Sequence, residues 1–400
     1  MALMPVDEAL RNILSGVKSL AIEKIRLDEA AGRVLAKSIF AKRDQPPFAA
    51  SAMDGYAVQA SDIVNVPVKL KLVGTSAAGH AFKGTLRQGQ AIRILTGAPL
   101  PKGADTVVIQ ENTNLSDSAI EVLSETLPGK NIRRAGLDFT RGDLLVAHGS
   151  KLSARDIGLL AAGNSPEVTT YRKPKVMLFT TGDELVLPGD RPRADQIISS
   201  NSHALEAMAK QLGAEVVNLG IVKDSLKATM SAVRKALGAD VLLTTGGASV
   251  GDHDYVQAAF KACGVNIAFW KIALRPGKPF MYGRKGRTHV MGLPGNPVSA
   301  LVTARIFLRP LMNVMQGLAP EETPTLARLA MALPVNDGRQ DYMRATLQIA
   351  PDGTRHVCVQ ASQDSSMQRL LQSSHCLIVR PPHAPAAEIG ALVPVILLDF

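Results

Sequence analysis

The chain has 400 residues, which is enough for roughly two or three domains. A hydrophobic content of 46% excludes an intrinsically disordered chain. The formal net charge of +10 is dispersed, without a run of five Lys or Arg residues, which argues against a nucleic-acid-binding tail. Such a charge fits a protein that attracts small anions, but on charge alone an ordinary solvated surface is the better interpretation.

The first part of the chain begins as a helix and continues as short strands. Residues 5–17 carry apolar side chains at helical spacing, on a face formed by Leu10, Ile13, Leu14 and Val17. In residues 46–146, β-branched runs alternate with Gly, Pro and Asn-Asp-Ser turns, which predicts a mostly antiparallel β-rich module.

A second helix is predicted after this module. Residues 152–163 have a helical pattern, with Ser153 as the N-cap and Gly163 as the stop signal. We therefore expect residues 1–45 and 147–173 to form an elongated N-terminal and linking segment on both sides of the β-rich module.

Strands and helices alternate in residues 174–315. The expected strands are 175–182, 215–222, 240–247 and 266–274, and the expected helices are 200–213, 225–238, 255–264 and 296–310. Residues 278–283 and 287–293 could form a hairpin, and the last helix has Asn296 as cap and Pro297 at its first position. This alternation predicts a central three-layer α/β domain with a mostly parallel sheet.

Short strands return in residues 316–400, which predicts a small C-terminal β domain, similar to a β-barrel. The chain as a whole is thus expected to be a multidomain α/β protein. Its three cysteines are isolated, which favours a reducing compartment. Since no signal peptide and no apolar run of about 18 residues is found, we expect a cytoplasmic protein that does not enter a membrane.

Carboxylates follow the predicted parallel strands where each strand ends. Ligands of such sheets lie beyond the carboxyl ends of the strands. Glu184, Asp224 and Asp254 follow three of these strands, although Asp224 could equally cap the next helix. Carboxylates together with glycine amides of the 246–251 loop predict a site for Mg²⁺ and phosphate.

The same loop allows a second interpretation. Residues 247–251 fit the G-x-S-x-G elbow of serine hydrolases, with Ser249 as nucleophile. An upstream oxyanion motif is missing from the sequence, and Asp252 and Asp254 would oppose a nearby oxyanion. The anion cradle is therefore favoured over the nucleophile.

Cations and helix starts offer further anion contacts. Lys271, Arg275 and Lys278 surround a Pro-Gly turn and could clamp a phosphate or oxyanion, or simply be solvated. Ser299, in the first turn of the last α/β helix, is a second candidate, with an ordinary capped helix start as the alternative.

Outside the α/β domain, Asp54, Thr96 and Asp138 lie in small-residue turns, where each taken singly is more often a turn residue than a catalyst. The eight histidines have no ligand spacing, so a zinc site is not expected.

Seven motifs in combination carry a family resemblance. They are PPFAASAMDGYAV, ILTGAPLPKGADTVV, NIRRAGLD, TTGDEL, TTGGASVGDHDY, RPGKPF and GLPGNPVSA. In this order they closely resemble the molybdopterin molybdenumtransferase family, which is related to the E domain of gephyrin, from about residue 5 to the end of the chain.

The resemblance implies a reaction and a set of partners. Members insert molybdenum from molybdate into adenylylated molybdopterin and release AMP, with Mg²⁺ as the usual cation. They are elongated homodimers of four subdomains whose cleft is formed by both subunits. A transient contact with the molybdopterin adenylyltransferase is also expected.

The resemblance also implies site residues. The acidic and metal-binding positions match Asp54, Asp138, Glu184, Asp224 and Asp254. Thr96 and Lys271 match further catalytic positions. Phosphates would be held by Gly246, Gly247, Ser249 and Gly251, and molybdate by Arg275, Lys278, Arg344 and Ser365, in addition to the anion contact at Ser299 considered above. Arg275 stands where many relatives have lysine.

Two rival functions stay open at this point. The adenylyltransferase of the preceding step shares the α/β domain, but the additional domains and the 51–58 motif favour the transferase. A non-catalytic scaffold, like gephyrin at receptors, is disfavoured by the retained carboxylates.

Overall fold

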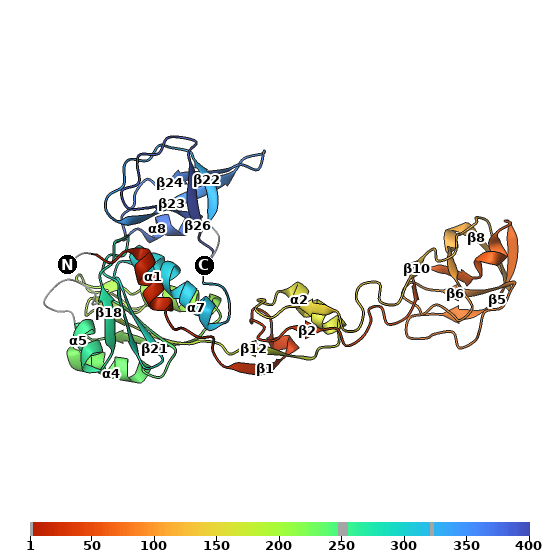
Figure 1. The fold of residues 1–400 in the computed structure, drawn as a ribbon, viewed down its shortest axis with the longest axis horizontal. Coiled ribbons are helices and arrows are strands. Elements are labelled where there is room, and N and C mark those ends of the chain that lie inside the picture. Colours follow the sequence, from red (N-terminus) through yellow and green to blue (C-terminus); the bar gives the residue numbers. More distant parts are fainter. Residues whose placement is uncertain (1–2, 247–254, 321–323) are drawn as a thin grey trace. The chain divides into compact units, whose positions relative to one another are not determined.

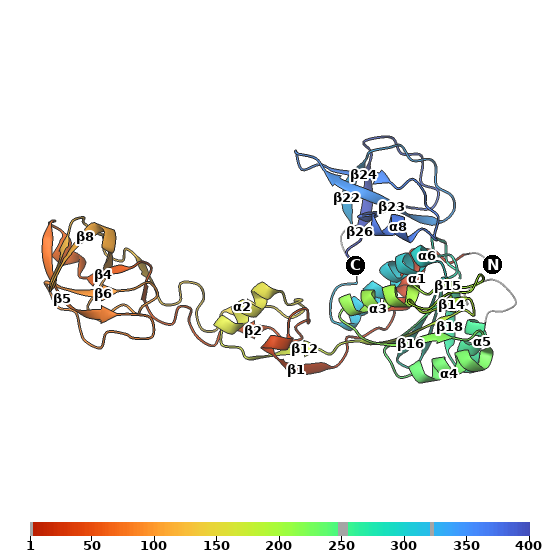
Figure 2. The ribbon, with the colours of Figure 1, turned by 180° about the vertical axis from the view of Figure 1, so that it is seen from behind.

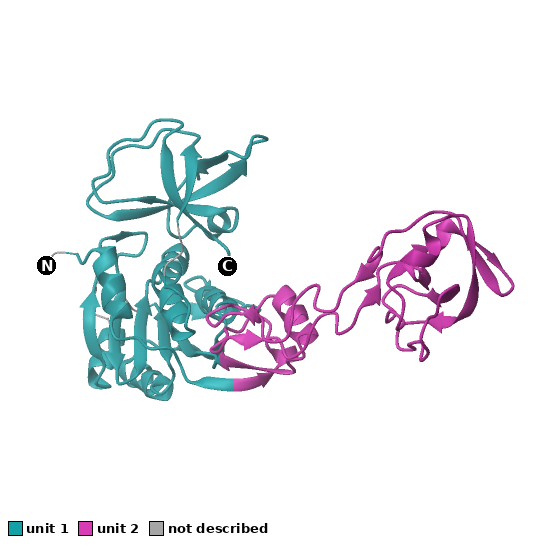
Figure 3. Cartoon of the chain, turned by 45° about the vertical axis from the view of Figure 1, so that its right-hand side comes forward, with its two compact units in different colours: residues 1–23, 171–400 teal, residues 24–170 magenta. Residues whose placement is uncertain are grey.

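The computed structural model describes residues 3–246, 255–320 and 324–400. The chain folds into two compact units (Figure 3). One consists of residues 24–170, and the other of residues 1–23 and 171–400. The unit 24–170 is therefore an insertion in the sequence of the other unit, which contains the residues before and after it.

The largest sheet of the unit 24–170 has six strands, in the order β7-β4-β6-β5-β9-β8. Its strands are β4 (Gly55–Val58), β5 (Val68–Ser76), β6 (Gln90–Ile94), β7 (Thr106–Ile109), β8 (Thr113–Ser116) and β9 (Ala119–Val122). All pairs are antiparallel except β5 and β6. Buried apolar side chains cluster on both faces of this sheet, so the rest of the unit covers both.

The helix predicted after the β-rich module is α2 (Ala154–Ala162). The Ser153 hydroxyl accepts from the Asp156 N–H at 3.4 Å, and the Asp156 carboxylate accepts from the Ser153 N–H at 2.7 Å. This reciprocal capping box confirms the predicted start, since both residues satisfy amides that a helix start leaves unpaired. Gly163 follows the last helical residue.

The second unit contains the α/β sheet, in the order β16-β13-β17-β21-β20-β18. Its strands are β13 (Lys175–Thr181), β16 (Glu215–Val222), β17 (Val241–Thr245), β18 (Asn266–Trp270), β20 (Met281–Lys285) and β21 (Thr288–Leu293). The first four in this order are parallel, and β20 and β18 add an antiparallel edge. β17 and β21 are buried throughout because helices cover both faces.

Two helix layers sandwich this sheet (Figures 1 and 2). The helices of one layer are α1 (Val6–Leu14), α3 (Asn201–Gln211), α6 (Pro297–Thr303) and α7 (Arg309–Met315). The other layer consists of α4 (Leu226–Ala236) and α5 (Tyr255–Ala262). The predicted three-layer α/β domain is therefore confirmed.

The helix after the last parallel strand is continuous through a π-helical stretch, Ala304–Leu308, that joins α6 to α7. Residues 297–315 are long and apolar enough to cross a membrane by length and composition, but 78% of their apolar stretch is buried inside the protein. Burial of this kind is what a core helix requires.

Two local expectations for the α/β domain differ from the structure. The strand expected over 266–274 ends at Trp270, because Lys271 takes a positive φ of 73° that breaks the extended backbone. Asn296 occupies the N-cap position of α6 without a side-chain cap bond. Its amide instead donates to the Ser365 hydroxyl at 2.8 Å, so a tertiary partner replaces the local one.

The C-terminal strands close into a barrel. They are β22 (Thr325–Leu329), β23 (Gln340–Ile349), β24 (Arg355–Val359), β25 (Cys376–Arg380) and β26 (Leu392–Leu397). Closure follows because the long strand β23 pairs with both β24 and β25. A short strand from the α/β domain, β19 (Leu274–Arg275), adds to β23 in parallel. The small β-barrel predicted for the C-terminal region is confirmed.

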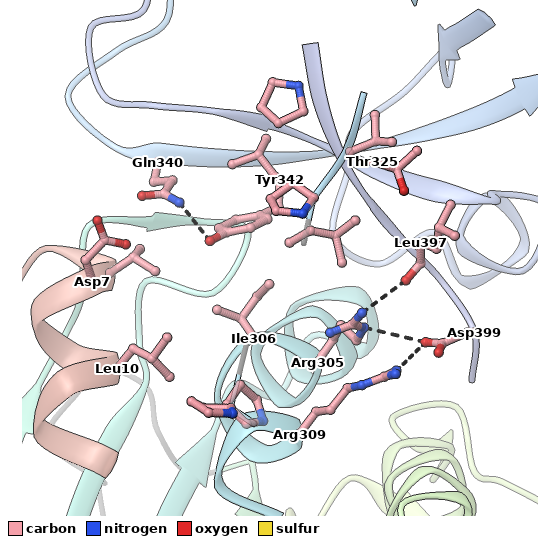
Figure 4. Close-up of a pocket in the computed structure, with 18 residues that line it drawn as sticks. Asp7, Leu10, Arg305, Ile306, Arg309, Thr325, Gln340, Tyr342, Leu397 and Asp399 are labelled. Carbon is pink, nitrogen blue, oxygen red and sulfur yellow. Dashed lines mark hydrogen bonds and ion pairs between the residues drawn. The ribbon is translucent and has the colours of Figure 1, made fainter. Parts of the chain in front are cut away.

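A cavity of about 590 Å³ lies between the barrel and helices α1 and α7 (Figure 4). Apolar side chains such as Leu10 and Ile306 form most of its wall. Arg305 and Arg309 approach Asp399 at one end, and Gln340 donates to the Tyr342 hydroxyl at 2.8 Å. Among the described residues that line it there is none of the site residues expected from the sequence.

A buried polar pair lies under the β20–β21 hairpin. The Tyr282 hydroxyl is 2.8 Å from His289 Nδ1 and donates to the Ile13 carbonyl at 3.3 Å. His289 is 2% exposed. Burial, aided by the nearby Arg284 and opposed by Asp240, lowers the pKa of His289 to about 4.

This burial predicts acid sensitivity. The unfolded chain takes up the His289 proton below pH 6.5, whereas the folded chain resists protonation until about pH 4. The neutral His289 therefore costs the folded state nothing above pH 6.5, and the free energy of unfolding decreases as the pH falls below this value. Between pH 7 and pH 5 we expect wild type to lose about 2 kcal/mol more unfolding free energy than His289→Gln in urea titrations. Equal losses in the two proteins would contradict this assignment.

Candidate functional site

Two acidic loops meet at the carboxyl end of the parallel sheet. β13 and β16 pair in parallel, with Thr181 opposite Val222, so the loops that follow them are adjacent. The Asp183 N–H donates to the Asp224 carboxylate at 3.3 Å, and the Asp224 N–H donates to the Asp183 carboxylate at 3.2 Å. The structure thus brings together the first two loops expected from the sequence.

Asp224 has a shifted pKa in this region. Its pKa is raised, first because burial removes water from the carboxylate and then because Asp183 and Glu184 add negative charge nearby. The alternative role of Asp224 as a helix cap is not observed, since Ser225 caps α4 by accepting from the Ala228 N–H at 3.3 Å. Asp224 is therefore held in an unfavourable charged environment without a capping function.

The glycine at the end of β17 is sterically required. Gly246 has φ +87°, and a Cβ there would lie 2.2 Å from the Thr181 carbonyl oxygen. The turn after β17 is thus pressed against the end of β13, where only glycine fits. The remaining expected residues of this loop, Gly247, Ser249, Gly251 and Asp254, lie outside the described residues.

Arg275 is not free to clamp an oxyanion as expected. Its Nε donates to Asp341 at 3.0 Å, its Nη1 to Asp337 at 3.0 Å, and its Nη2 makes a second contact with Asp341. The cause is the pairing of β19 with β23, which sets Arg275 opposite Asp341. Hydrogen bonding to Asp341 raises the Arg275 pKa, and the guanidinium joins the barrel to the α/β domain.

The two lysines of this segment differ in surroundings. Lys278 is exposed, so its ammonium group is accessible to an anion. The Lys271 ammonium lies 4.4 Å from the centre of the Trp270 ring, a cation–π contact that fixes its direction.

Arg344 differs from its expected role as a molybdate contact. It is 1% exposed and donates to the carbonyl oxygens of Asp364 at 2.8 Å, Met367 at 3.1 Å and Ser362 at 3.2 Å. Burial lowers its pKa. Since its donors face the backbone of residues 362–367, the arginine shapes the segment that carries Ser365.

That segment covers the start of α6. The Ser365 hydroxyl accepts from Asn296, and the Ser365 carbonyl accepts from the Val298 N–H at 3.1 Å. Ser299 is 5% exposed inside the same helix. A loop of the barrel domain therefore already occupies one amide of this turn, and the anion seat at Ser299 stays a prediction.

In the unit 24–170, Asp54 and Thr96 are brought together. The Asp54 carboxylate accepts from the Thr96 N–H at 2.7 Å and from the Thr96 hydroxyl at 2.8 Å. These bonds, the backbone one first, lower the pKa of Asp54, so it is an ionised carboxylate at neutral pH. Asp138 is exposed in another turn, where its N–H donates to the Gln45 carbonyl at 2.9 Å.

Sequence reasoning did not single out Asn201, which lies at the same edge of the sheet. It begins α3, and its amide donates to the Thr245 hydroxyl at 3.0 Å and to the Gly295 carbonyl at 2.6 Å. In the sequence Asn201 is simply the second residue of the helix expected over 200–213. The only local feature that could have indicated a special role is its place as a polar residue at the start of a helix.

Gly246 gives a direct test of this packing. Gly246→Ala adds a backbone clash to an unfavourable positive φ, whereas Gly286→Ala has a φ of +57° but no atom within 4 Å of the new Cβ. We expect Gly246→Ala to lose at least about 2 kcal/mol more unfolding free energy than Gly286→Ala in urea titrations. Similar losses would mean that the Thr181 contact is not a constraint.

Comparisons with known proteins agree along the whole chain. Residues 4–163 match the MoeA N-terminal region (domain I and II), residues 177–314 a probable molybdopterin binding domain, and residues 326–398 the MoeA C-terminal region (domain IV). A molybdopterin molybdenumtransferase of Haemophilus influenzae is 37% identical over 364 residues, which cover 89% of both chains. Another, from a Nostoc species, is 39% identical over 77% of this chain and 72% of its own.

A solved structure extends the likeness to the fold. The molybdopterin biosynthesis MoeA protein of Pyrococcus horikoshii OT3 is 29% identical, with a TM-score of 0.81 over 99% of this chain and 100% of that one. The chain belongs to the molybdopterin molybdenumtransferase family, the one that its sequence motifs resemble, and is therefore a transferase.

Proposed function

We propose that this protein inserts molybdenum from molybdate into adenylylated molybdopterin and releases AMP. Family membership supports the proposal, and relatives named molybdopterin molybdenumtransferase share most of their length with this chain. The observation that carries it is the pair of loops at Asp183 and Asp224, whose carboxylates converge one strand away from the Gly246 turn. Such an edge can receive a cation and a phosphate together.

Mg²⁺ is part of the proposal, and the donor set fits it. Among the described residues no three His, Cys, Asp or Glu side chains form a metal cage. Mg²⁺ needs none, since it commonly binds one or two carboxylates and completes its shell with water and substrate phosphates. Asp224 and Glu184 would hold it, and its positive charge would offset both the burial and the repulsion that raise the Asp224 pKa. When bound, it supplies a Lewis acid for the phosphoanhydride.

Molybdate would bind where the barrel domain meets the start of α6. Ser365 offers a hydroxyl there, and the exposed Lys278 could add charge-assisted hydrogen bonds if the anion reaches it. Arg344 would act through the backbone of residues 362–367, and Arg275 by joining the two domains. Asp54, Thr96, Asp138, Asp254 and Lys271 stay in the proposal as catalytic groups on the strength of the motif match.

Further expectations belong to the same proposal. They are a homodimer, a cytoplasmic location and a transient contact with the molybdopterin adenylyltransferase. Family membership supports the first and third, and cysteine usage supports the second.

The decisive assay supplies adenylylated molybdopterin and Mg²⁺ and measures AMP with and without molybdate. We expect AMP to appear only when molybdate is present. ATP consumption that does not depend on molybdate would favour the adenylyltransferase, and no turnover of either kind would favour a scaffold.

The role of Asp224 predicts a distinctive pattern of thermal stability. Since its raised pKa means that the folded state disfavours the ionised form, Asp224→Asn should unfold at the same or a higher temperature than wild type without Mg²⁺. Added Mg²⁺ should raise the unfolding temperature of wild type and of the surface control Asp352→Asn, but raise that of Asp224→Asn much less. A full Mg²⁺ response in Asp224→Asn would remove this residue from the cation site.

A further inference from the structure

Asn201 links the ends of two parallel strands. It is the first residue of α3, and one amide nitrogen donates both to the Thr245 hydroxyl at 3.0 Å and to the Gly295 carbonyl at 2.6 Å. The Thr245 hydroxyl donates onward to the Pro294 carbonyl at 2.9 Å. One short network therefore joins the end of β17 to the loop after β21.

The network lies directly beside the tightest point of the sheet edge. Thr245 is 1% exposed and precedes Gly246, whose backbone is pressed against the Thr181 carbonyl at the end of β13. A Cβ on Gly295 would lie 3.7 Å from the Gly246 Cα, so the two glycine backbones are also close neighbours. Three strand ends thus meet around the bonds that Asn201 makes.

Asn201 is itself anchored from the barrel domain. The preceding residue, Ser200, accepts from the Gln368 side chain at 2.6 Å. Gln368 begins α8 (Gln368–Gln372), which follows the Ser365 segment and lies beside α6 (Figure 2). Because the start of α3 is held from outside, the Asn201 amide is a fixed point to which the two loops are tied.

We propose that Asn201 is a positioning residue for the transfer reaction. The inference rests on the proposed function and assigns Asn201 no contact with substrate. By fixing Thr245 and Gly295, Asn201 sets where the chain leaves β17 at Gly246 and how far that turn lies from the start of α6. These two places receive the phosphate end of adenylylated molybdopterin and molybdate, so their separation determines how well the reactants align.

The test compares Asn201→Ala, Thr245→Val and the double variant. The control is Asn218→Ala in the same domain, which loses a donor bond to Glu206 at 3.0 Å and an acceptor bond from the Gly220 N–H at 2.9 Å. Thr245→Val keeps the size and branching of a buried strand residue while removing the hydroxyl. The measurements are kcat and KM for molybdate-dependent AMP release, and the unfolding temperature of each variant.

We expect Asn201→Ala to lower kcat/KM about tenfold or more, with an unfolding temperature similar to that of the active Asn218→Ala control. Because Asn201 acts on the Gly246 turn through Thr245, the double variant should lose little more activity than the more impaired single variant. If the loss of kcat/KM in the double variant were the product of the two single losses, Asn201 would not act through Thr245. A loss of kcat/KM in Asn201→Ala no greater than in the control would overturn the inference as well.

Other outcomes keep the inference separate from the proposed function. If Asn201→Ala fails to fold, Thr245→Val alone decides, since normal kcat/KM in that variant overturns the inference. If wild type itself releases no AMP, the proposed function fails and the positioning role falls with it. An active wild type with unimpaired Asn201 and Thr245 variants defeats only the inference.

Discussion

Parallel pairing of four adjacent strands is the constraint on which the site depends. Because β16, β13, β17 and β21 all run the same way, their carboxyl ends lie at one edge of the sheet. Loops that are distant in sequence therefore become neighbours, such as those that follow Thr181 and Thr245. The repulsive carboxylates after β13 and β16 and the close glycine backbones after β17 and β21 follow from this arrangement.

The barrel domain also contacts this edge of the sheet. Arg344 uses buried donors to hold residues 362–367, and that segment reaches Asn296 and, through Gln368, the start of α3. A buried guanidinium is unfavourable unless its donors are satisfied, and here three backbone carbonyls accept from it. Arg344 is thus one of the groups that determine the shape of the Ser365 segment.

Local patterns in the sequence were sufficient to predict much of the fold. The capping box at Ser153 and the alternation of strands and helices are encoded within a few residues, so they could be recognised without tertiary information. The acidic loops were also predictable, because strand direction alone makes them adjacent. The positive φ of Lys271 had no such signal, since lysine rarely adopts it.

Side-chain partners were less predictable because they come from distant segments. Arg275 has the charge of an anion clamp, but the pairing of β19 with a strand more than sixty residues later gives it Asp341. Asn296 has the sequence context of a cap but bonds to Ser365. In both cases the residue type was informative about chemistry, and only the fold could decide which group it meets.

The most direct test of the whole account is a crystal structure of the protein with Mn²⁺ in place of Mg²⁺ and with molybdate, read from the anomalous signals of both metals. The account predicts a manganese peak about 2 Å from carboxylate oxygens of Asp224 or Glu184 and a molybdenum peak within hydrogen-bonding distance of Lys278 or Ser365. Peaks that occur reproducibly elsewhere, with this edge of the sheet left empty, would contradict it.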